Sequence, residues 1–543
     1  MLIPKNNIEL IYNFIPVFLL YAEIHFSFKW FRSRLFIKEP EILSDLPVRI
    51  EPGKQLPILI LIKDAHIFPI KLQNIEVILY QDCKIILNYE KQYILPINNH
   101  WWDDTLLIDV YNISGIIQVN VIITYEINGD TKTCNIHNYP LSSHDRMETF
   151  ISEYLYPNDE NVVYGDLHYH SNLTEDMVEF GAPIKSTLEA AEAMGLDFFC
   201  NTDHSYDLDD KPGSWTETDP KLEKWNKSRI EIERLNSESS SSSFIIPSEE
   251  LSLHNNKGKN IHALIINNKS FLPGAGDGAE KLFHYEAEYD TINLHDKMEE
   301  NSLCIAAHPF NKPPLLQRLL FKRGIWEKDD ILPENMIGLQ ILNGELDKSF
   351  YLSLTIWIKL LLEGHHKYIY AGNDAHGNFN QYRQIGIPML TLKEKKQQLF
   401  GQFRTGVIVR GKSKNVTTTI NSLRKGNCFI TTGPFLDIIC RLSKSTYNMG
   451  STVNSNTGIL EIVIKSSPEF GVINKIIIKK GIIGEKAEMD HFIIANLHKF
   501  QFKHKYEIYT SAYCYYRCIV ELNAVRDVKT FAFSNPIWLK PIS

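Results

Sequence analysis

The sequence predicts an α/β protein in which a central parallel sheet or barrel lies between two β-rich domains. Short apolar runs rich in β-branched residues, separated by turns, dominate both ends of the chain. Between residues 161 and 412, strand-like and helix-like segments alternate instead, as in a parallel α/β domain. A typical domain has about 150 residues, so the 543 residues leave room for several.

The first 156 residues are expected to form an antiparallel β-sandwich. Apolar runs at 56–62, 75–80 and 116–125 have the length and composition of strands. An earlier apolar run from Leu10 to Ala22 contains Pro16 and is shorter than the 18 or so residues that would span a bilayer. We interpret it as a buried strand and not as a signal peptide or membrane anchor.

The middle and the end of the chain differ in the pattern of their predicted secondary structure. In the middle domain, 161–412, a helical stretch from Ile184 to Met194 precedes a strand-like run from Leu196 to Asn201. In the last domain, 413–543, a short helix from Thr417 to Arg424 is stopped by Gly426 and strands follow. The sequence therefore predicts a second, C-terminal β domain.

The net charge and the cysteine content indicate which partners and which cellular compartment to expect. The net charge of -8 and the pI near 6.2 give no overall basic surface, so nucleic acid is not the expected partner. The eight cysteines form no CxxC pair or disulfide-like framework. We expect a cytoplasmic protein without a membrane segment, while secretion and the oligomeric state stay open.

Two histidines at the start of the central region suggest a metal site. His168 and His170 lie two apart in a strand-like segment, so their side chains should share one face of the strand about 7 Å apart. Such a pair can hold one ion or two neighbouring ions. An isolated pair of this kind is common by chance, so it carries little weight by itself.

Further histidines and carboxylates follow predicted strands in order. The segments are Thr202-Asp203-His204, Glu249-Glu250, His308-Pro309 and Asp374-Ala375-His376. Ligands at the carboxyl ends of successive parallel strands converge on one mouth of a barrel, where such folds place their active sites. His262 is a lone histidine on an apolar strand, a pattern more typical of a core residue, and only its place in this series makes it a candidate ligand.

Strand alternation sorts some neighbouring residues. We expect His204 to be a ligand and Asp203 to support the site, because a carboxylate beside a metal-binding histidine commonly orients the ring. Asp374 and His376, two apart, can both face inward. For Glu249 and Glu250, geometry leaves both choices open.

In this order, the motifs resemble those of the PHP superfamily, named for its polymerase and histidinol phosphatase members, and most closely its carbaryl-hydrolase-like branch. The resemblance spans roughly residues 161–435. It is carried by Asp166-Leu167-His168-Tyr169-His170, Thr174-Glu175-Asp176-Met177, Gly195-Leu196-Asp197-Phe198-Phe199, Thr202-Asp203-His204-Ser205-Tyr206, Leu272-Pro273-Gly274-Ala275-Gly276-Asp277 and Gly372-Asn373-Asp374-Ala375-His376-Gly377. It implies a distorted (β/α)7 barrel of the TIM-like kind, which would be flanked by the N-terminal and C-terminal β-sandwiches expected from the strand pattern, and a centre of two or three metals.

The resemblance also implies a ligand set. The matching residues are His168, His170, His204, Glu250, His262, His308, Asp374 and His376. Glu250 is preferred over its neighbour because Pro247-Ser248-Glu249-Glu250-Leu251-Ser252 matches a proline-glycine-x-glutamate-x-serine pattern, although Ser248 departs from the glycine. Where many members have an aspartate seven residues after the first histidine, this chain has Glu175 followed by Asp176, so the carboxylate that binds there stays open.

Imidazoles and carboxylates together suit zinc, manganese or iron better than calcium or magnesium. Two or three such ions activate water for hydrolysis. The expected substrate is a phosphate ester, the chemistry of most of the wider superfamily. The alternative, implied by the closer branch, is an amide, carbamate or carboxylic ester, and the substrate could be a small molecule or an oligomer. A further alternative is a non-catalytic, metal-stabilised binding protein.

The candidate catalytic residues are Asp203, His308 and Glu175. A histidine or carboxylate at the rim, such as Asp203 or a ligand that swings free, would protonate the leaving group. Arg318, Lys322 and Arg323 follow the His308 loop and would hold an anionic substrate if they lay over the mouth. The simpler interpretation of these three cations is a solvated basic helix end.

Overall fold

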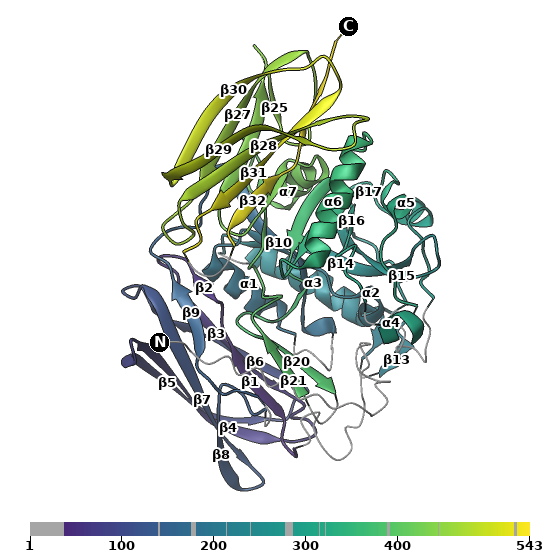
Figure 1. Ribbon diagram of the computed structural model, residues 1–543. Coiled ribbons are helices and arrows are strands. Elements are labelled where there is room, and N and C mark those ends of the chain that lie inside the picture. Colours follow the sequence, from purple (N-terminus) through teal and green to yellow (C-terminus); the bar gives the residue numbers. More distant parts are fainter. Residues whose placement is uncertain are drawn as a thin grey trace.

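The structure is a computed structural model in which strands dominate and helices cluster in the middle of the chain (Figure 1). It describes residues 37–139, 142–174, 181–212, 214–238, 241–276, 286–313, 315–320, 322–387, 391–443, 445–525 and 529–542. The apolar run from Leu10 to Ala22 lies outside the described residues. Within the described ranges, no helix has both the length and the apolar character needed to cross a membrane.

Residues 41–151 form two sheets that share one apolar core. The three-stranded sheet contains β1 (Glu41–Asp45), β3 (Leu56–Lys63) and β6 (Trp101–Ile108). The six-stranded sheet contains β2 (Arg49–Ile50), β4 (Ile70–Gln81), β5 (Lys84–Ile97), β7 (Gly115–Ile127), β8 (Asp130–Asn135) and β9 (Met147–Ile151). Along β7, alternate residues are buried, as expected for a strand with one face on a core.

The central strands begin the largest sheet of the described chain. Their order is β18-β17-β16-β15-β14-β11-β10-β22. The strands are β10 (Val162–His170), β11 (Phe198–Asn201), β14 (Phe244–His254), β15 (Asn260–Ile266), β16 (Leu303–Ala306), β17 (Met336–Asn343), β18 (Tyr368–Gly372) and β22 (Arg404–Ile408). Shorter strands are β12 (Asp210–Lys211), β13 (Ser214–Thr218), β19 (Ala375–His376), β20 (Tyr382–Ile387) and β21 (Thr391–Lys395).

Helices connect some of these strands. They are α1 (Ile184–Met194), α2 (Ser205–Leu208), α3 (Glu223–Glu238), α4 (Leu315–Leu320), α5 (Lys328–Ile331) and α6 (Lys348–Leu362), with the 3-10 turns η1 (Asn172–Thr174) and η3 (Asn293–Lys297). The helix predicted from Ile184 to Met194 is confirmed. It ends at Gly195, whose φ of 71° is the left-handed conformation that closes many helices.

The expected TIM-like, distorted (β/α)7 barrel is wrong. The pairs β10-β11, β11-β14, β16-β17 and β17-β18 are parallel, but β15 runs antiparallel to both β14 and β16. The physical reason is the short loop 255–259, whose Gly258 at φ 65° turns the chain straight back as a hairpin. β22 is also antiparallel to β10 and continues the sheet into the C-terminal strands. The result is one large mixed sheet in a mainly β protein, and not a ring of seven βα units.

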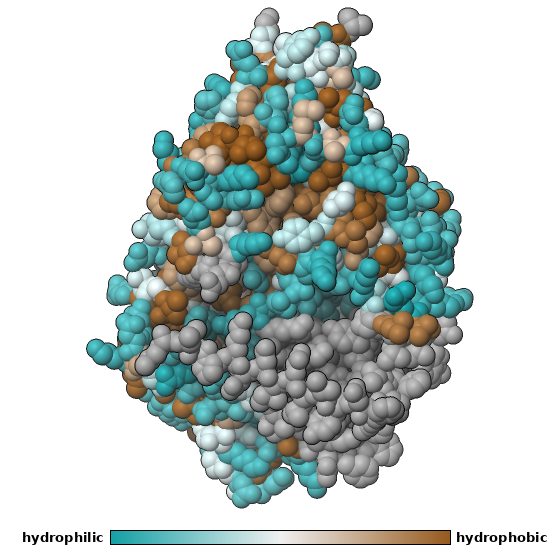
Figure 2. All heavy atoms as spheres, in the orientation of Figure 1, coloured by the Kyte–Doolittle hydropathy of each residue, from teal (hydrophilic) through white to brown (hydrophobic). Residues whose placement is uncertain are grey.

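The C-terminal strands continue this sheet and pack against a second one. The continuation contains β23 (Cys428–Thr431), β26 (Thr452–Asn454), β28 (Ile473–Ile482), β29 (Met489–Lys499), β31 (Cys514–Leu522), β32 (Phe531–Ser534) and β33 (Ile537–Lys540). The second sheet contains β24 (Phe435–Arg441), β25 (Thr446–Asn448), β27 (Thr457–Lys465) and β30 (Gln501–Tyr509). Helix α7 (Val416–Arg424) precedes them. Figure 2 shows that hydrophobic residues interrupt the hydrophilic surface over these strands.

Candidate metal centre

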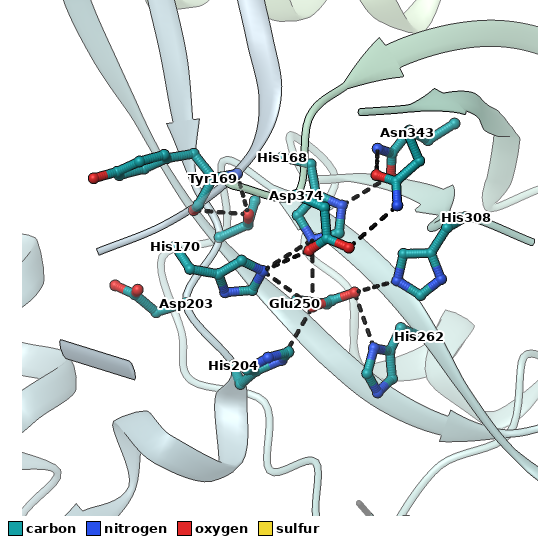
Figure 3. Close-up of polar contacts among 12 residues, drawn as sticks. His168, Tyr169, His170, Asp203, His204, Glu250, His262, His308, Asn343 and Asp374 are labelled. Carbon is teal, nitrogen blue, oxygen red and sulfur yellow. Dashed lines mark hydrogen bonds and ion pairs between the residues drawn. The ribbon is translucent and has the colours of Figure 1, made fainter. Parts of the chain in front are cut away.

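All eight predicted ligands lie close together in the central region. Figure 3 shows most of them pointing toward one another from different elements. β10 supplies His168 and His170, β14 supplies Glu250 and β15 supplies His262. The remaining ligands are His204 at the start of α2, His308 after β16, Asp374 after β18 and His376 on β19.

Backbone pairing brings several of these residues together. His204 forms a parallel bridge with Glu250. His170 pairs with His376, and the Asp374 amide donates to the His168 carbonyl at 2.9 Å. The main chain therefore places these residues next to one another.

Glu250 lies at the middle of the cluster with 1% of its surface exposed. Its Oε2 atom is 3.3 Å from His168 Nε2, 3.4 Å from His170 Nε2 and 3.0 Å from His204 Nδ1. None of the groups in the described ranges makes a hydrogen bond to this oxygen. A buried carboxylate oxygen that is close to three ring nitrogens but hydrogen-bonded to none is better matched to a cation than to a proton donor.

The other oxygen of Glu250 faces a second pair of imidazoles. Oε1 is 3.0 Å from His262 Nδ1 and 3.1 Å from His308 Nε2. Glu250 thus has ring nitrogens near both of its oxygens. A carboxylate in this position can bridge two neighbouring ions.

Asp374 completes the first group of donors. Its Oδ1 is 3.2 Å from the Nε2 atoms of both His168 and His170, and 3.8 Å from His376 Nε2. Asp374 has a φ of 53°, a left-handed conformation that is costly for a residue other than glycine. Strain of this kind is concentrated at functional sites.

The spacing of the first group fits a small tetrahedral ion. The Nε2 atoms of His168 and His170 are 3.0 Å apart, and each lies 3.2 to 3.4 Å from Glu250 Oε2 and Asp374 Oδ1. Four donors around an ion with bonds of about 2.0 to 2.1 Å would lie about 3.3 Å apart. Two further groups, His204-Glu250-His262 and His170-His204-His376, have donor atoms within 4.8 Å of one another. The residues therefore fit the expected centre of two or three divalent ions.

Charge in the cluster keeps its two carboxylates ionised. Burial would raise the pKa of Glu250, but His262, His168 and His204 hold it well below its usual value. Burial also acts to raise the pKa of Asp374, and again nearby imidazoles, His168 first, lower it well below the ordinary range. Both carboxylates are therefore ionised at neutral pH, as metal ligands must be.

The two histidines of β10 differ in their electrostatics. Burial lowers the pKa of His170, and the neighbouring rings of His376 and His204 lower it further, so His170 is neutral. Burial also acts to lower the pKa of His168, but Asp374 and Glu250 outweigh it and the pKa is raised.

Two amide residues that the sequence analysis missed hold the ligands in place. His168 Nδ1 lies 2.9 Å from Gln340 Oε1, a carbonyl oxygen that can only accept, so Nδ1 carries a proton and Nε2 is the nitrogen that faces the centre. Gln340 Nε2 donates to Asn343 Oδ1 at 2.7 Å, and Asn343 Nδ2 donates to Asp374 Oδ2 at 3.2 Å. The signal that could have found Gln340 is a polar residue within the apolar run of β17, where its side chain is fully buried.

Asp203 does not orient a histidine ring in the contacts of the described chain, so the predicted role needs correction. Its carboxylate accepts hydrogen bonds from the Ser171 amide (2.6 Å) and hydroxyl (2.7 Å), the Thr174 hydroxyl (3.0 Å) and Asn201 Nδ2 (2.7 Å). Figure 3 shows this carboxylate pointing away from Glu250. Asp203 therefore fastens the turn that follows β10, and it is poorly placed to donate a proton to a substrate.

The other candidate catalytic residues have different positions. Glu175 and Asp176 lie outside the described residues. His308 has 20% of its side chain exposed, more than any other ligand candidate for which the exposure of the side chain is given, so it lies at the rim. Its φ of 28° adds a second strained ligand position.

The structure also chooses between the two adjacent glutamates. Glu249 faces away from the ring nitrogens and accepts hydrogen bonds from Asn268 Nδ2 at 2.5 Å and from the Leu272 amide at 3.2 Å. Burial raises its pKa to about 8, although Arg229 opposes the shift. Of the two glutamates, Glu250 is therefore the candidate ligand, and Glu249 supports its strand from the other side.

One of the three predicted cations reaches the centre. Arg323 Nη2 is 2.9 Å from His262 Nε2. Lys322 instead forms an ion pair with Glu286 at 3.2 Å, and Arg318 is exposed on α4. The interpretation of these cations as a solvated helix end therefore fits Arg318, which is exposed, but not Arg323, which contacts His262.

Comparisons with known proteins do not identify a family. No protein-family model and no curated protein matches the chain. Among solved structures, a cycloisomaltooligosaccharide glucanotransferase from Paenibacillus sp. is 8% identical, with 91% of this chain and 71% of that chain covered and a TM-score of 0.17. Native alpha-2-macroglobulin from Escherichia coli, from domain MG7 to the C-terminus, is 9% identical, with coverages of 92% and 99% and a TM-score of 0.14. At these scores the similarities support no conclusion about fold or activity.

Proposed function

We propose that this protein is a metal-dependent hydrolase that uses two or three divalent ions to hydrolyse a phosphate ester. The observation that carries the proposal is the position of Glu250, with ring nitrogens 3.0 to 3.4 Å from both of its oxygens. Six imidazoles and two carboxylates in one cluster are costly to bury without a bound cation. This donor set suits zinc, manganese or iron.

The residues of the cluster would have two kinds of role, binding the ions and orienting the residues that bind them. His168, His170, Glu250 and Asp374 would hold one ion, while Glu250 would share a second with His204 and His262. Ions bound in this way would activate water and neutralise charge on the oxygen that is attacked. Gln340 and Asn343 would keep His168 and Asp374 in the orientation that binding requires.

The preference for a phosphate ester rests on Arg323. The backbone of this residue is anchored by a parallel bridge to Asn260, two residues before His262 on β15. The anchor holds a guanidinium at the edge of the centre, 2.9 Å from the His262 ring. A guanidinium at this place can bind the non-bridging oxygens of a phosphoryl group, which a neutral acyl substrate lacks.

His308 is the best placed proton donor among the described residues. Its imidazole lies at the rim, with 20% of its side chain exposed, and Nε2 is 3.1 Å from Glu250 Oε1. In our proposal this ring gives a proton to the leaving oxygen and regains it from solvent.

The test is metal content together with turnover of three substrates: p-nitrophenyl phosphate, bis-p-nitrophenyl phosphate and p-nitrophenyl acetate. We expect metal-dependent release of p-nitrophenol from a phosphate ester. His168→Ala and Glu250→Gln should lower kcat/KM by about 100-fold or more. His144→Ala, an exposed histidine of the N-terminal region, is the matched control and should change nothing.

Three results would redirect the proposal. Turnover of the acetate alone would favour acyl chemistry. Bound metal without turnover on a wider panel would favour a metal-stabilised binding protein. A purified chain that takes up no zinc, manganese or iron would remove the basis of the enzyme assignment.

A further inference from the structure

A second cluster of ligand-type side chains lies in the N-terminal region, outside the centre described above. It consists of Asp64, which follows β3, His66 in the next turn, and His100, which precedes β6. β3 and β6 are antiparallel neighbours with Lys63 opposite Trp101. One step further along this register, Asp64 faces His100, and the Asp64 amide donates to the His100 carbonyl at 2.8 Å.

A tight turn brings the third residue to the same place. Asp64 has a left-handed φ of 66°, and its carbonyl accepts hydrogen bonds from the amides of Ile67 (3.0 Å) and Phe68 (3.2 Å). The turn brings His66 back over His100, and the two rings meet edge to face with their centroids 4.9 Å apart.

We propose that Asp64, His66 and His100 form a separate divalent metal site. His100 Nε2 lies 3.2 Å from Asp64 Oδ1, close to the spacing of about 3.3 Å between two donors on a tetrahedral ion. One donor atom from each of the three residues lies within 4.8 Å of the other two. Two imidazoles and one carboxylate suit zinc, with a water molecule as the fourth ligand.

Lys63, the residue before Asp64, has its positive charge engaged by other partners. Lys63 is largely buried, and its ammonium lies 3.7 Å from Glu41 Oε2. It also lies over the ring of Trp101 at 4.6 Å from the centroid. Glu41 and Trp101 therefore offset the charge of Lys63, which reduces its repulsion of an ion at the three ligands.

The position of the site indicates a structural role. The chain leaves the three-stranded sheet after β3 to enter β4 of the six-stranded sheet, and it returns from β5 to β6. Asp64 and His66 belong to the first crossing and His100 to the second. An ion held by all three would therefore tie together the two crossings that connect the sheets, and would stabilise the folded N-terminal region by mass action.

The test uses the full-length chain with all three donor groups of the central cluster disrupted by His204→Ala and Glu250→Gln, so that zinc bound elsewhere can be counted. Zinc alone is the probe, in equilibrium dialysis and in thermal unfolding followed by circular dichroism. We expect His66→Ala and His100→Ala each to remove one zinc ion per chain, or to weaken its binding at least tenfold. Both should also reduce the rise in the unfolding midpoint that zinc produces.

His144→Ala is the control, because His144 is an exposed histidine of the same region that lies outside the cluster. It should leave zinc binding unchanged. If His100→Ala fails to fold, His66→Ala decides, because the His66 side chain is exposed and its removal creates no cavity. Unchanged zinc stoichiometry, affinity and unfolding midpoint in His66→Ala would overturn the proposal.

Discussion

At the scale of single residues, the candidate centre depends on side chains that bind no ion themselves. Gln340 fixes which nitrogen of His168 faces the centre, and Asn343 holds the outer oxygen of Asp374. The two amides are joined by their own hydrogen bond, so one strand, β17, positions ligands from β10 and from the loop after β18. Rigid support of this kind commonly decides how tightly a site binds its metal.

Replacing Gln340 tests this support. Gln340→Leu keeps the size of the side chain but removes the acceptor for the His168 Nδ1 proton, so the ring can turn or change its tautomer. We expect metal affinity to fall about 10- to 100-fold while the unfolding midpoint changes little. Metal titration with a competing chelator measures this change.

Gln340→Glu is the comparison variant, because its carboxylate still accepts from His168 while, like leucine, it loses the donor to Asn343. It should retain most of the affinity that the leucine variant loses. Equal affinity in the leucine variant and the original protein would show that the ring is oriented by its packing alone.

At the scale of elements, the close contact between β18 and β10 requires a glycine. A Cβ atom at Gly372 would lie 2.7 Å from His168 Cβ and 2.8 Å from the His168 amide nitrogen. These are backbone or near-backbone atoms, which cannot move without shifting a strand.

Gly372→Ala should therefore displace His168 and disturb the centre. We expect a loss of about 1 to 3 kcal/mol in the free energy of unfolding, the usual range for overpacking. Metal affinity should fall in parallel. Chemical denaturation and metal titration on the same preparation measure both quantities, and a variant with unchanged values would show that the two strands can separate at low cost.

The residues that the structure gathers into the candidate centre could be picked out from the sequence because imidazoles and carboxylates are rare in apolar strand-like segments. The strand ends could not. Glu250 was expected after a strand ending near Pro247, but β14 runs on to His254 and places Glu250 in its middle. The antiparallel direction of β15 could not be predicted either. The loop around Gly258 has the sequence of an ordinary turn, which does not show whether the next strand runs parallel or antiparallel.

The role of Asp203 was missed for a related reason. The argument from alternation holds only while a strand is regular, and β11 already ends at Asn201. Beyond this point the side chain turns toward Ser171 instead of supporting His204. The contact of Arg323 with His262 was equally hidden, because it depends on a bridge between segments distant in the sequence.

The connection from α6 to β18 contains a buried lysine with a consequence for stability. Lys367 Nζ donates to the carbonyls of Pro333 (2.8 Å) and Met336 (2.5 Å). Burial lowers its pKa from the ordinary 10.5 to about 8. Between these two values the unfolded chain binds more protons than the folded one, so this group makes the free energy of unfolding rise with pH.

Lys367→Met isolates this effect. We expect the difference in unfolding free energy, original protein minus variant, to increase on the order of 3 kcal/mol from pH 7.5 to about pH 10.5. Denaturant unfolding across this range measures the difference and cancels the titration of other groups. A difference that stays flat with pH would mean that Lys367 keeps an ordinary pKa in the folded protein.

At the scale of the whole molecule, one buried arginine connects all three regions of the chain. Arg49 on β2 binds Glu469 of the C-terminal region through two contacts at 2.7 and 2.9 Å, and Glu51 at 2.9 Å. It also donates to the carbonyl of Met194 at the end of α1. Both Arg49 and Glu469 have side chains less than a tenth exposed.

Because the large sheet also continues from β22 into the C-terminal strands, the regions should unfold together.

Arg49→Met would leave two buried carboxylates without their cation, which typically costs about 3 to 5 kcal/mol. Lys54→Met is the control: Lys54 also joins the N-terminal region to α1, at 2.7 Å from Glu192, but this pair is partly exposed and should contribute less than about 1 kcal/mol. We therefore expect a much lower unfolding midpoint for Arg49→Met than for Lys54→Met, with a single transition in both. Equal midpoints, or separate transitions in the original protein, would show that the three regions are stabilised independently and that the buried ion pair is not what joins them.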